Sequence, residues 1–389
     1  MKQVPITQAV KITKKRVKSF DEEKGYLSTG DLNVNVIKNL EPVTYENRPS
    51  RADLIVDVGD LIVARMQATK KVMLISEEEE EIIVSTGFLT LESKEGWDNE
   101  FLYFYFNSPN FQDQKDRFCT GATQKAINNT KFKEITIPEI SLEDQKRLVS
   151  SLREADKIGK NRRKAIALLD QYLKSVFLEM FGETAENYKK WETIEMQDLA
   201  EKKKGSMRTG PFGSDLKHSE FVDEGIAVIG IDNAVQNKFA WDERRFITKE
   251  KYQKLKRYTL YPDDVIITIM ATTGRSAVIP QDIPLSINTK HLASITLDRN
   301  KANPYFISYS IHSNPLITKQ IGQKNRGAIM AGLNLGIIKK LKLKYPPIKL
   351  QNKFAEILQK TEKIKQSMFS QSAELDTNFN ALMQGAFRK

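Results

Sequence analysis

The stretch Gly121-Ala122-Thr123-Gln124-Lys125-Ala126-Ile127-Asn128 recurs in altered form 206 residues later, as Gly327-Ala328-Ile329-Met330-Ala331-Gly332-Leu333-Asn334. The same shift carries Gln145 onto Gln351, Leu152 onto Leu358 and Phe181 onto Phe387 without a gap. Upstream, residues 59–63 match residues 263–267 at a shift of 204. Self-similarity over this distance indicates an internal duplication of a whole domain.

Each copy of the repeat ends in a segment that is typical of a long helix. Positions counted in steps of 4, 3, 4 and 3 from Leu148 or from Phe354 are apolar at both ends of the segment and less apolar in its middle. The predicted helices cover residues 142–181 and 349–388, each about 60 Å long at 1.5 Å per residue. The predicted seam consists of Leu148, Leu152, Ile166, Leu169, Leu173, Val176, Phe354, Leu358, Leu375, Phe379 and Leu382.

Prolines and caps define where these helices begin. Pro138 and Pro346-Pro347 close the preceding strands, because proline ends a ladder and opens a helix. Ser141 with Asp144 three residues later is an acidic variant of the capping box. Gly182 is expected to stop the first helix, and a polar linker follows it. Two such seams can pack on each other, or each helix can lie on the core of its own domain; the regular spacing and the equal lengths favour paired helices that act as a spacer.

The segments before the helices are expected to be mixed α/β globules. Strand-like runs include residues 54–56, 61–63, 82–84, 227–229 and 265–267. Short helices are expected at residues 100–107 and 304–312. The fold class is therefore α+β, with two α/β domains related by the repeat.

Composition narrows the function. The net charge is +11, but residues 1–200 carry 30 Lys and Arg against 33 Asp and Glu, whereas residues 201–389 carry 31 against 17. Such a basic half indicates a polyanion partner, or else a lysine-rich solvated surface. Cys119 is the only cysteine, which excludes a disulfide framework and favours a cytoplasmic setting. No apolar run approaches a membrane span, and residues 1–20 do not resemble a secretory signal.

Together these motifs resemble the specificity (S) subunits of type I restriction–modification systems. The resemblance covers nearly the whole chain and rests on residues 121–128, Ile137-Pro138, residues 142–148 and their second copies. Trp191, Leu199 and residues 205–217 also look like the opening of a target-recognition domain. The first half departs from this pattern, because it has no such tryptophan near Met1, which leaves its N-terminal boundary in doubt.

The resemblance implies an arrangement of five parts. A first target-recognition domain would cover residues 1–140 and a first spacer helix 141–182, followed by a linker at 183–190. A second target-recognition domain would cover 191–347 and a second spacer helix 348–389. Each domain would read one half of a split site in double-stranded DNA, and divergence between the domains predicts an asymmetric site. The two helices would pair as an antiparallel coiled coil that serves as a spacer and as a dock for two methyltransferase (M) subunits. Restriction (R) subunits would join them, and S-adenosylmethionine, ATP and Mg²⁺ would be bound by those partners.

Candidate DNA contacts lie in segments rich in Gly, Thr or Asn that are predicted to be loops, since basic and amide side chains on loops can reach phosphates and base edges. In the first half these are Arg48, Arg51, Arg65, Gln67, Lys70, Gln124 and Lys125. In the second half they are Arg208, Lys217, Thr273, Arg275, Lys290, His291, Lys324 and Arg326.

Three short motifs could suggest catalysis and are better explained by structure. Residues 303–306, Asn-Pro-Tyr-Phe, resemble an amino-methyltransferase loop, but Asn and Pro also suit a helix N-cap and first position. Asp263-Asp264 lacks the further residues of a nuclease site, and Phe212-Gly213-Ser214 is too short for a cofactor loop. The histidines show no metal-ligand spacing, so no catalytic and no metal site is expected. Two other functions stay open: a target-reading subunit of another methyltransferase class, and a coiled-coil adaptor that does not bind DNA.

Overall fold

The computed structural model describes residues 2–241, 243–325 and 332–387. The chain divides into two compact units. Unit 1 consists of residues 1–164 and 369–389, and unit 2 of residues 165–368. Each unit therefore holds one globular part and a segment of both long helices, α4 (Leu142–Phe181) and α9 (Ile348–Ala386).

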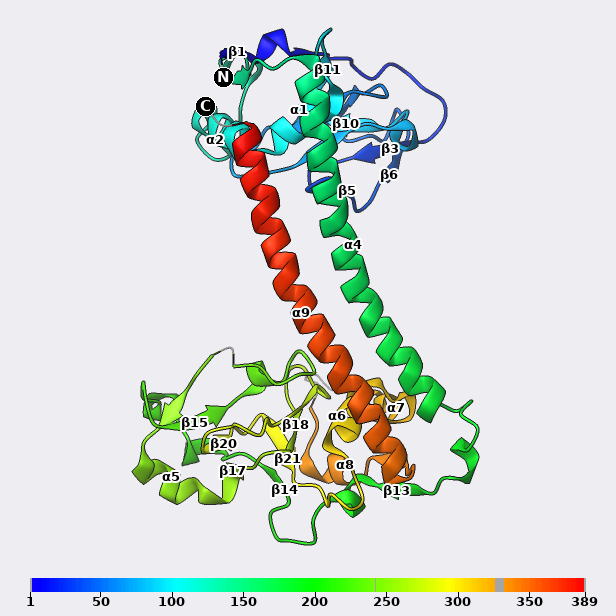
Figure 1. Ribbon diagram of the computed structural model, residues 1–389, viewed down its shortest axis with the longest axis vertical. Helices are drawn as coiled ribbons and strands as arrows, with labels where there is room; N and C mark the ends of the chain where they lie inside the picture. The colour runs from blue at the N-terminus through cyan, green and yellow to red at the C-terminus, as the bar shows by residue number, and fades with distance from the viewer. Residues whose placement is uncertain (1, 242, 326–331, 388–389) are drawn as a thin grey trace. The chain divides into compact units, whose positions relative to one another are not determined.

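The two units share one sheet topology, and Figure 1 draws strands in both units beside segments of α4 and α9. In unit 1 the strand orders are β6-β3-β10-β7, β2-β11-β8-β9 and β1-β12, and in unit 2 they are β16-β15-β20-β17, β14-β21-β18-β19 and β13-β22. In the first of these sheets the two central strands are parallel, β3 with β10 in unit 1 and β15 with β20 in unit 2. The other pairings are antiparallel. The described part of unit 1 also contains a hairpin, β4-β5, between β3 and β6.

The bounds of the strands in unit 1 are β1 Gln3–Pro5, β2 Val10–Ile12, β3 Lys24–Leu27, β4 Leu32–Asn33, β5 Val36–Ile37, β6 Glu41–Val43, β7 Ala52–Ile55, β8 Leu61–Ala64, β9 Val72–Leu74, β10 Ile83–Ser85, β11 Phe88–Ser93 and β12 Thr136–Pro138. Those in unit 2 are β13 Thr193–Glu195, β14 Met207–Thr209, β15 Ile226–Ile229, β16 Phe246–Ile247, β17 Thr259–Leu260, β18 Val265–Thr268, β19 Ser276–Val278, β20 Ser286–Asn288, β21 Leu292–Ile295 and β22 Lys342–Lys344. The short helices are α1 Asn99–Asn107, α2 Pro109–Phe118 and α3 Asn129–Phe132 in unit 1, and α5 Lys249–Leu255, α6 Pro304–Ser313, α7 Pro315–Asn325 and α8 Leu335–Lys339 in unit 2. The duplication predicted from the sequence is confirmed, as is the mixed α and β content.

A buried glutamine at the start of each long helix shows how closely the copies agree. The side-chain oxygen of Gln145 accepts from the backbone N–H of Asp98 at 2.9 Å, and its amide donates to the carbonyls of Gly96 and Ile140. Gln351 repeats the pattern with the N–H of Asn303 at 3.0 Å and the carbonyls of Lys301 and Pro346. Both side chains are buried. Because buried polar groups must be paired, this glutamine locks each helix to the N-terminus of α1 or α6.

The predicted caps are present. The Ser141 hydroxyl accepts from the N–H of Asp144 at 3.2 Å and donates to its carboxylate at 2.7 Å. Asn303 caps α6 through its side-chain oxygen, with Pro304 as the first helical residue. Residues 303–306 are therefore a helix start, as the sequence predicts.

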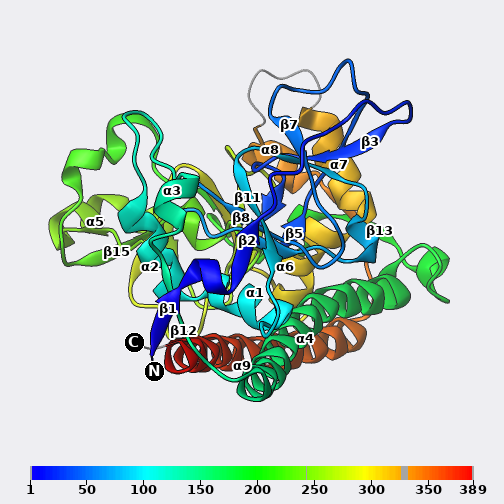
Figure 2. The same cartoon turned by 90° about the horizontal axis from the view of Figure 1, so that it is seen from above.

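The long helices pack antiparallel within each unit. In unit 1, Val149 and Leu152 of α4 share a core with Met383, Ala386 and Phe387 at the end of α9. In unit 2, Phe177 and Phe181 at the end of α4 pack on Phe354 at the start of α9, with ring centroids 5.3 and 5.7 Å away. In Figure 2 the last turn of α9 lies beside β1 and β12, in agreement with that shared core.

Most residues of the predicted seam point inward. Near the C-terminal end of each helix, however, the buried residue comes one position later than predicted. Leu152, Ile166, Leu173 and Phe354 are buried, while Leu148, Leu169, Val176, Leu358, Leu375 and Phe379 are half-buried. The prediction for Leu382 is wrong, since its side chain is 48% exposed and Met383 fills the core instead. Phe177 replaces Val176 in the same way at the equivalent position of α4. A helix with 3.6 residues per turn drifts from a strict heptad, so the inward face moves forward by one residue.

Candidate nucleic-acid interface

The loops that follow the strands of unit 2 meet at one edge, which we call the strand-end edge of unit 2. It consists of residues 210–212 after β14, 269–275 after β18, and 289–291 after β20. The N–H of Thr289 donates to the carbonyl of Ile229 at 2.9 Å, and the N–H of Ile269 to that of His291 at 2.9 Å. The first bond ties the turn after β20 to the end of β15, and the second ties it to the loop after β18.

Gly210 allows two of these loops to pack closely against each other. A Cβ atom at this position would lie 2.2 Å from the carbonyl carbon of Thr289 and 2.4 Å from the carbonyl oxygen of Asn288. No side chain fits at such distances, so only glycine allows this approach. The loop after β14 is therefore pressed against the β20–β21 turn.

Unit 1 has an equivalent strand-end edge, formed by residues 65–70 after β8, the β10–β11 turn and residues 120–127. The N–H of Gln67 donates to the carbonyl of Lys125 at 2.9 Å, and the N–H of Ile127 to that of Arg65 at 2.9 Å. Gly121 has a φ of +139°, and a Cβ there would lie 2.5 Å from the Gln124 carbonyl oxygen. The glycine that opens the repeated motif is thus needed for the tight turn at this edge.

The chain's similarity to known proteins fits this duplicated architecture. The model of the type I restriction modification DNA specificity domain matches residues 4–168 and again residues 188–375. The chain belongs to this family. The two matches cover both units, so the family's domain occurs twice in one chain, in agreement with the repeated topology.

Individual relatives of the family are distant in sequence. The type I restriction enzyme MjaVIII specificity subunit of Methanocaldococcus jannaschii is 22% identical over 203 residues, which are 48% of this chain and 45% of that protein. The match thus spans less than half of the curated relative. A solved structure on complex assembly and conformational transition of the type I R-M system has a TM-score of 0.66 at 17% identity, covering 100% of this chain and 97% of the other. The S subunit from M. genitalium has a TM-score of 0.59 at 15% identity, covering 100% and 96%.

Several candidates predicted from the sequence lie on the strand-end edges. In unit 2, Thr273, Arg275, Lys290 and His291 lie on the edge, with Arg275 and Lys290 exposed. Burial and the nearby Lys290 lower the pKa of His291, so this imidazole is neutral at pH 7. In unit 1, the exposed side chains are Arg51, Gln67, Lys70, Gln124 and Lys125. Arg51 belongs to the edge through its carbonyl, which accepts from Thr86 in the β10–β11 turn at 2.9 Å.

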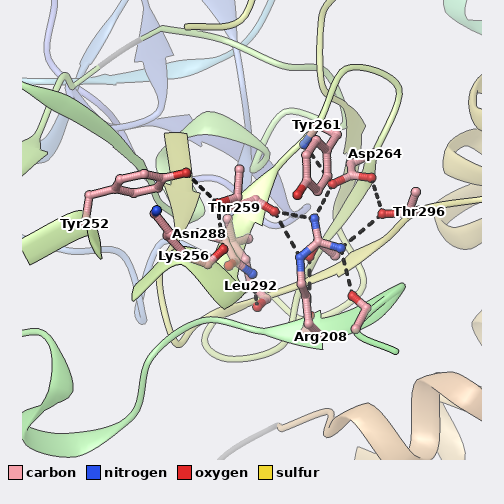
Figure 3. A network of polar contacts seen from close by, with 11 residues as sticks. Arg208, Tyr252, Lys256, Thr259, Tyr261, Asp264, Asn288, Leu292 and Thr296 are labelled. Carbon is pink, nitrogen blue, oxygen red and sulfur yellow. Dashed lines mark hydrogen bonds and ion pairs between the residues drawn. The ribbon is translucent and has the colours of Figure 1, made fainter. Parts of the chain in front are cut away.

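Arg208 is a correction to the sequence prediction. It lies on β14 rather than on a loop, and its side chain is 8% exposed. Figure 3 shows its guanidinium enclosed by Asp264, Thr296 and the carbonyl of Thr259. The ion pair with Asp264 measures 2.5 Å, and Gly205 accepts a further bond at 3.1 Å. Since these buried acceptors occupy the guanidinium, Arg208 is a core cation and not an accessible DNA contact.

Two arginines of unit 1 also hold loops in place. Arg65 donates from Nε to the carbonyl of Phe88 at 2.9 Å and from a terminal nitrogen to that of Ile127 at 3.3 Å. Arg48 donates to the carbonyls of Ala52 and Tyr45 and lies over the Tyr45 ring, 4.0 Å from its centroid. Both arginines are half-buried, so they shape the surface that their exposed neighbours present.

The other candidates are less closely tied to an edge. Lys217 is exposed between the 3₁₀ turns Gly213–Asp215 and His218–Glu220, and its N–H donates to Glu220 at 2.7 Å. Arg326 and the side chain of Lys324 lie outside the described residues.

Sequence reasoning missed two features of the edges. The first is a buried clamp in unit 1: Lys115 donates to the carbonyls of Met66 at 3.1 Å and Thr69 at 2.7 Å. The second is Phe212, which is 57% exposed on the edge of unit 2. A lysine inside a polar helix is ordinarily solvated, so only the three-dimensional contacts reveal the clamp.

The acidic and histidine residues show no arrangement for metal binding in the described parts of the chain. Asp263 has a φ of +66° in a turn, and Asp264 is the partner of Arg208. Within residues 2–241, 243–325 and 332–387, no group of three or more His, Cys, Asp or Glu side chains is placed to hold a metal ion. Across the same residues, no helix is sufficiently long and apolar to cross a membrane.

Proposed function

We propose that this chain is the DNA-reading subunit of a type I restriction–modification complex and carries no catalytic centre of its own. Unit 1 reads one half of a bipartite site in double-stranded DNA, and unit 2 reads the other. The observation that carries the proposal is the pair of strand-end edges: the sheet framework is repeated, while the loops at its edge carry different side chains. One framework with two different reading surfaces suits an asymmetric DNA target.

The chemistry belongs to partner proteins in this proposal. Two methyltransferase subunits dock on the long helices, and restriction subunits join that assembly. S-adenosylmethionine, ATP and Mg²⁺ bind to those partners, in the cytoplasm. The family match to both halves and the two long helices support this assignment.

Salt-dependent DNA binding tests the proposed surface. In unit 2, Arg275 and Lys290 are exposed cations on the strand-end edge, and each phosphate contact that is lost lowers the slope of log K against log[salt] by about 0.9. We expect the double variant Arg275→Gln, Lys290→Gln to reduce the slope by up to about 1.8 on the mapped target. The matched control is Lys202→Gln with Lys204→Gln, two exposed lysines that precede β14 at its opposite end. Unchanged affinity and slope in the edge variant would show that this edge does not meet DNA.

Domain exchange tests independent reading. If residues 191–347 are replaced by the matching domain of a related subunit, methylation mapping of the reconstituted complex should show a new second half-site and an unchanged first one. A simultaneous change of both half-sites would refute independent reading. Methylation by the purified chain alone would refute the absence of a catalytic centre.

A further inference from the structure

One large apolar side chain stands out on the strand-end edge of unit 2. Phe212 is 57% exposed and follows Gly210 and the buried Pro211. Single exposed apolar residues are common on protein surfaces, so exposure alone carries little weight. The backbone that carries the ring and the residues around it indicate its role.

The loop that carries Phe212 is held on both sides. Before it, Gly210 packs so closely against the backbone of Asn288 and Thr289 that a side chain at this position would not fit. After it, the carbonyl of Phe212 accepts from the N–H of Asp215 at 3.1 Å, and Gly213 adopts a φ of +57°. The ring therefore projects from a fixed support, and binding through it would cost little ordering entropy.

The surroundings of Phe212 combine apolar and basic groups. Met270, on the adjoining loop of the same edge, is 40% exposed. Arg275 and Lys290 are exposed on this edge as well. Protein–protein interfaces are depleted of lysine at their core, whereas nucleic-acid surfaces place cations for phosphates beside rings that meet bases.

The equivalent segment in unit 1 is different. Arg208 pairs with Ser294 in unit 2, and Thr13 takes the same place opposite Thr90 in unit 1, where the two hydroxyls lie 2.8 Å apart. Beyond this pair the two chains follow different paths, because Gly210 packs on the Thr289 turn, whereas the carbonyl of Lys15 accepts from the N–H of Ile55 in β7 at 3.0 Å. Val17 is half-buried against the core around Tyr26 and donates its N–H to the carbonyl of Asp53 at 3.1 Å. The apolar projection after β14 is thus a property of unit 2.

We propose that Phe212 inserts at a base step of the half-site that unit 2 reads and unstacks that step. The proposal rests on the proposed function, because it takes the strand-end edge as the DNA-facing surface. A phenyl ring cannot bond a phosphate, but it can stack on a base or wedge between two of them. In unit 1 the chain that follows β2 is bonded to β7 through Val17, so we expect the distortion at the half-site that unit 2 reads.

The test uses the full chain purified with its methyltransferase subunits, on a target that has first been mapped by methylation. Duplexes carry 2-aminopurine at successive positions of the second half-site, since its fluorescence rises when stacking is lost. We expect wild-type binding to raise the fluorescence at one step and Phe212→Ala to abolish that rise. Affinity should fall about 5- to 150-fold, the range for loss of one aromatic–base contact, while the salt slope stays unchanged because no phosphate contact is lost.

The matched control is Leu285→Ala. Leu285 is 47% exposed and lies at the end of β20 opposite the Thr289 turn, so its removal should leave fluorescence and affinity as in the wild type. Equal fluorescence in Phe212→Ala and the wild type overturns the inference. So does a loss of methyltransferase subunits on size exclusion with unchanged DNA fluorescence, which would make Phe212 a protein contact. If the wild-type complex binds no specific DNA, the proposed function fails, and this inference fails with it.

Discussion

The loops after β8 in unit 1 and after β18 in unit 2 occupy the same place in the repeat but are supported by different chemistry. In unit 1, the buried Lys115 bonds the carbonyls of Met66 and Thr69, and the Asp116 carboxylate accepts from the N–H of Ala68 at 3.1 Å. In unit 2 the equivalent residues are Ile321 and Gly322, which line a cavity of about 290 Å³ beneath the loop. The sheet framework is the same in both units, while the side chains that support this loop differ.

The two units also differ at a second pair of equivalent residues, the buried aspartates Asp264 and Asp60. Asp264 in unit 2 is fully buried and pairs with Arg208. Asp60 in unit 1 is also buried, but Thr13 stands where Arg208 would be. Burial raises the pKa of Asp60 to about 6, although Lys15 acts in the opposite direction. At equivalent positions, the carboxylate of Asp264 is thus part of an ion pair, whereas that of Asp60 is close to neutral in mildly acidic solution.

The largest expected effect comes from breaking the ion pair of unit 2. Asp264→Asn leaves the Arg208 charge buried without a counter-ion, which typically costs about 3–5 kcal/mol of unfolding free energy. Hydrogen exchange should accelerate in β14, β18 and β21, while β8 and β11 of unit 1 stay protected. The control is Asp282→Asn, an exposed carboxylate of unit 2. Unchanged protection in unit 2 would contradict a structural role for the pair.

The equivalent change in unit 1 should have the opposite sign. The pKa of Asp60 in the folded protein is about 6, against an ordinary value of 3.8. The protonated carboxyl therefore stabilises unit 1 fully below pH 4, and this stabilisation is lost as the pH rises through about 6. Asp60→Asn removes the buried charge, so it should stabilise unit 1 by about 1–3 kcal/mol above pH 7 and have little effect near pH 4.

The fluorescence of Trp97, in a background with Trp191→Phe and Trp241→Phe, follows the urea midpoint of unit 1 at both pH values. Asp113→Asn is the control, since Asp113 is an exposed carboxylate on α2 of unit 1. A destabilisation by Asp60→Asn at pH 7 would show that the ionised carboxylate is needed.

The smallest effect should come from the loop clamp. Lys115→Met keeps the volume but removes the bonds to Met66 and Thr69, so residues 66–71 should open more easily, by about 1–2 kcal/mol. Their hydrogen exchange should then approach that of residues 270–275 in unit 2, where Ile321 stands at the position of Lys115. Lys131→Met, which alters a lysine that is only half-buried and pairs with Glu134, is the control. If wild-type residues 66–71 already exchange as fast as 270–275, the clamp does not distinguish the two loops.

The features predicted correctly from the sequence are those that depend on neighbouring residues. The long helices, the Ser141 and Asn303 caps and the duplication all leave local signals, since helix period and capping act within a few residues.

The features that were missed depend on which distant strands meet. Arg208 looks like a loop cation until the pairing of β14 with β21 turns its side chain toward Asp264. Lys115 looks solvated until α2 brings it beneath the loop after β8. The seam prediction failed at Leu382 because a heptad template ignores the slow rotation of a real helix face. Long side chains with mixed apolar and charged character are therefore the hardest to assign from sequence.

The packing of Met383 and Phe387 into the core of unit 1 has a consequence for how the chain is made. Domains tend to fold in order as they leave the ribosome. Residues 165–368 form unit 2 as one uninterrupted stretch, so it can close as soon as it has emerged. Unit 1 begins first but finishes last, because its aromatic core waits for Phe387 to reach Phe101 and Tyr105. A nascent chain stalled near residue 368 would thus expose an open apolar core at its older end, the state in which chaperones and proteases act.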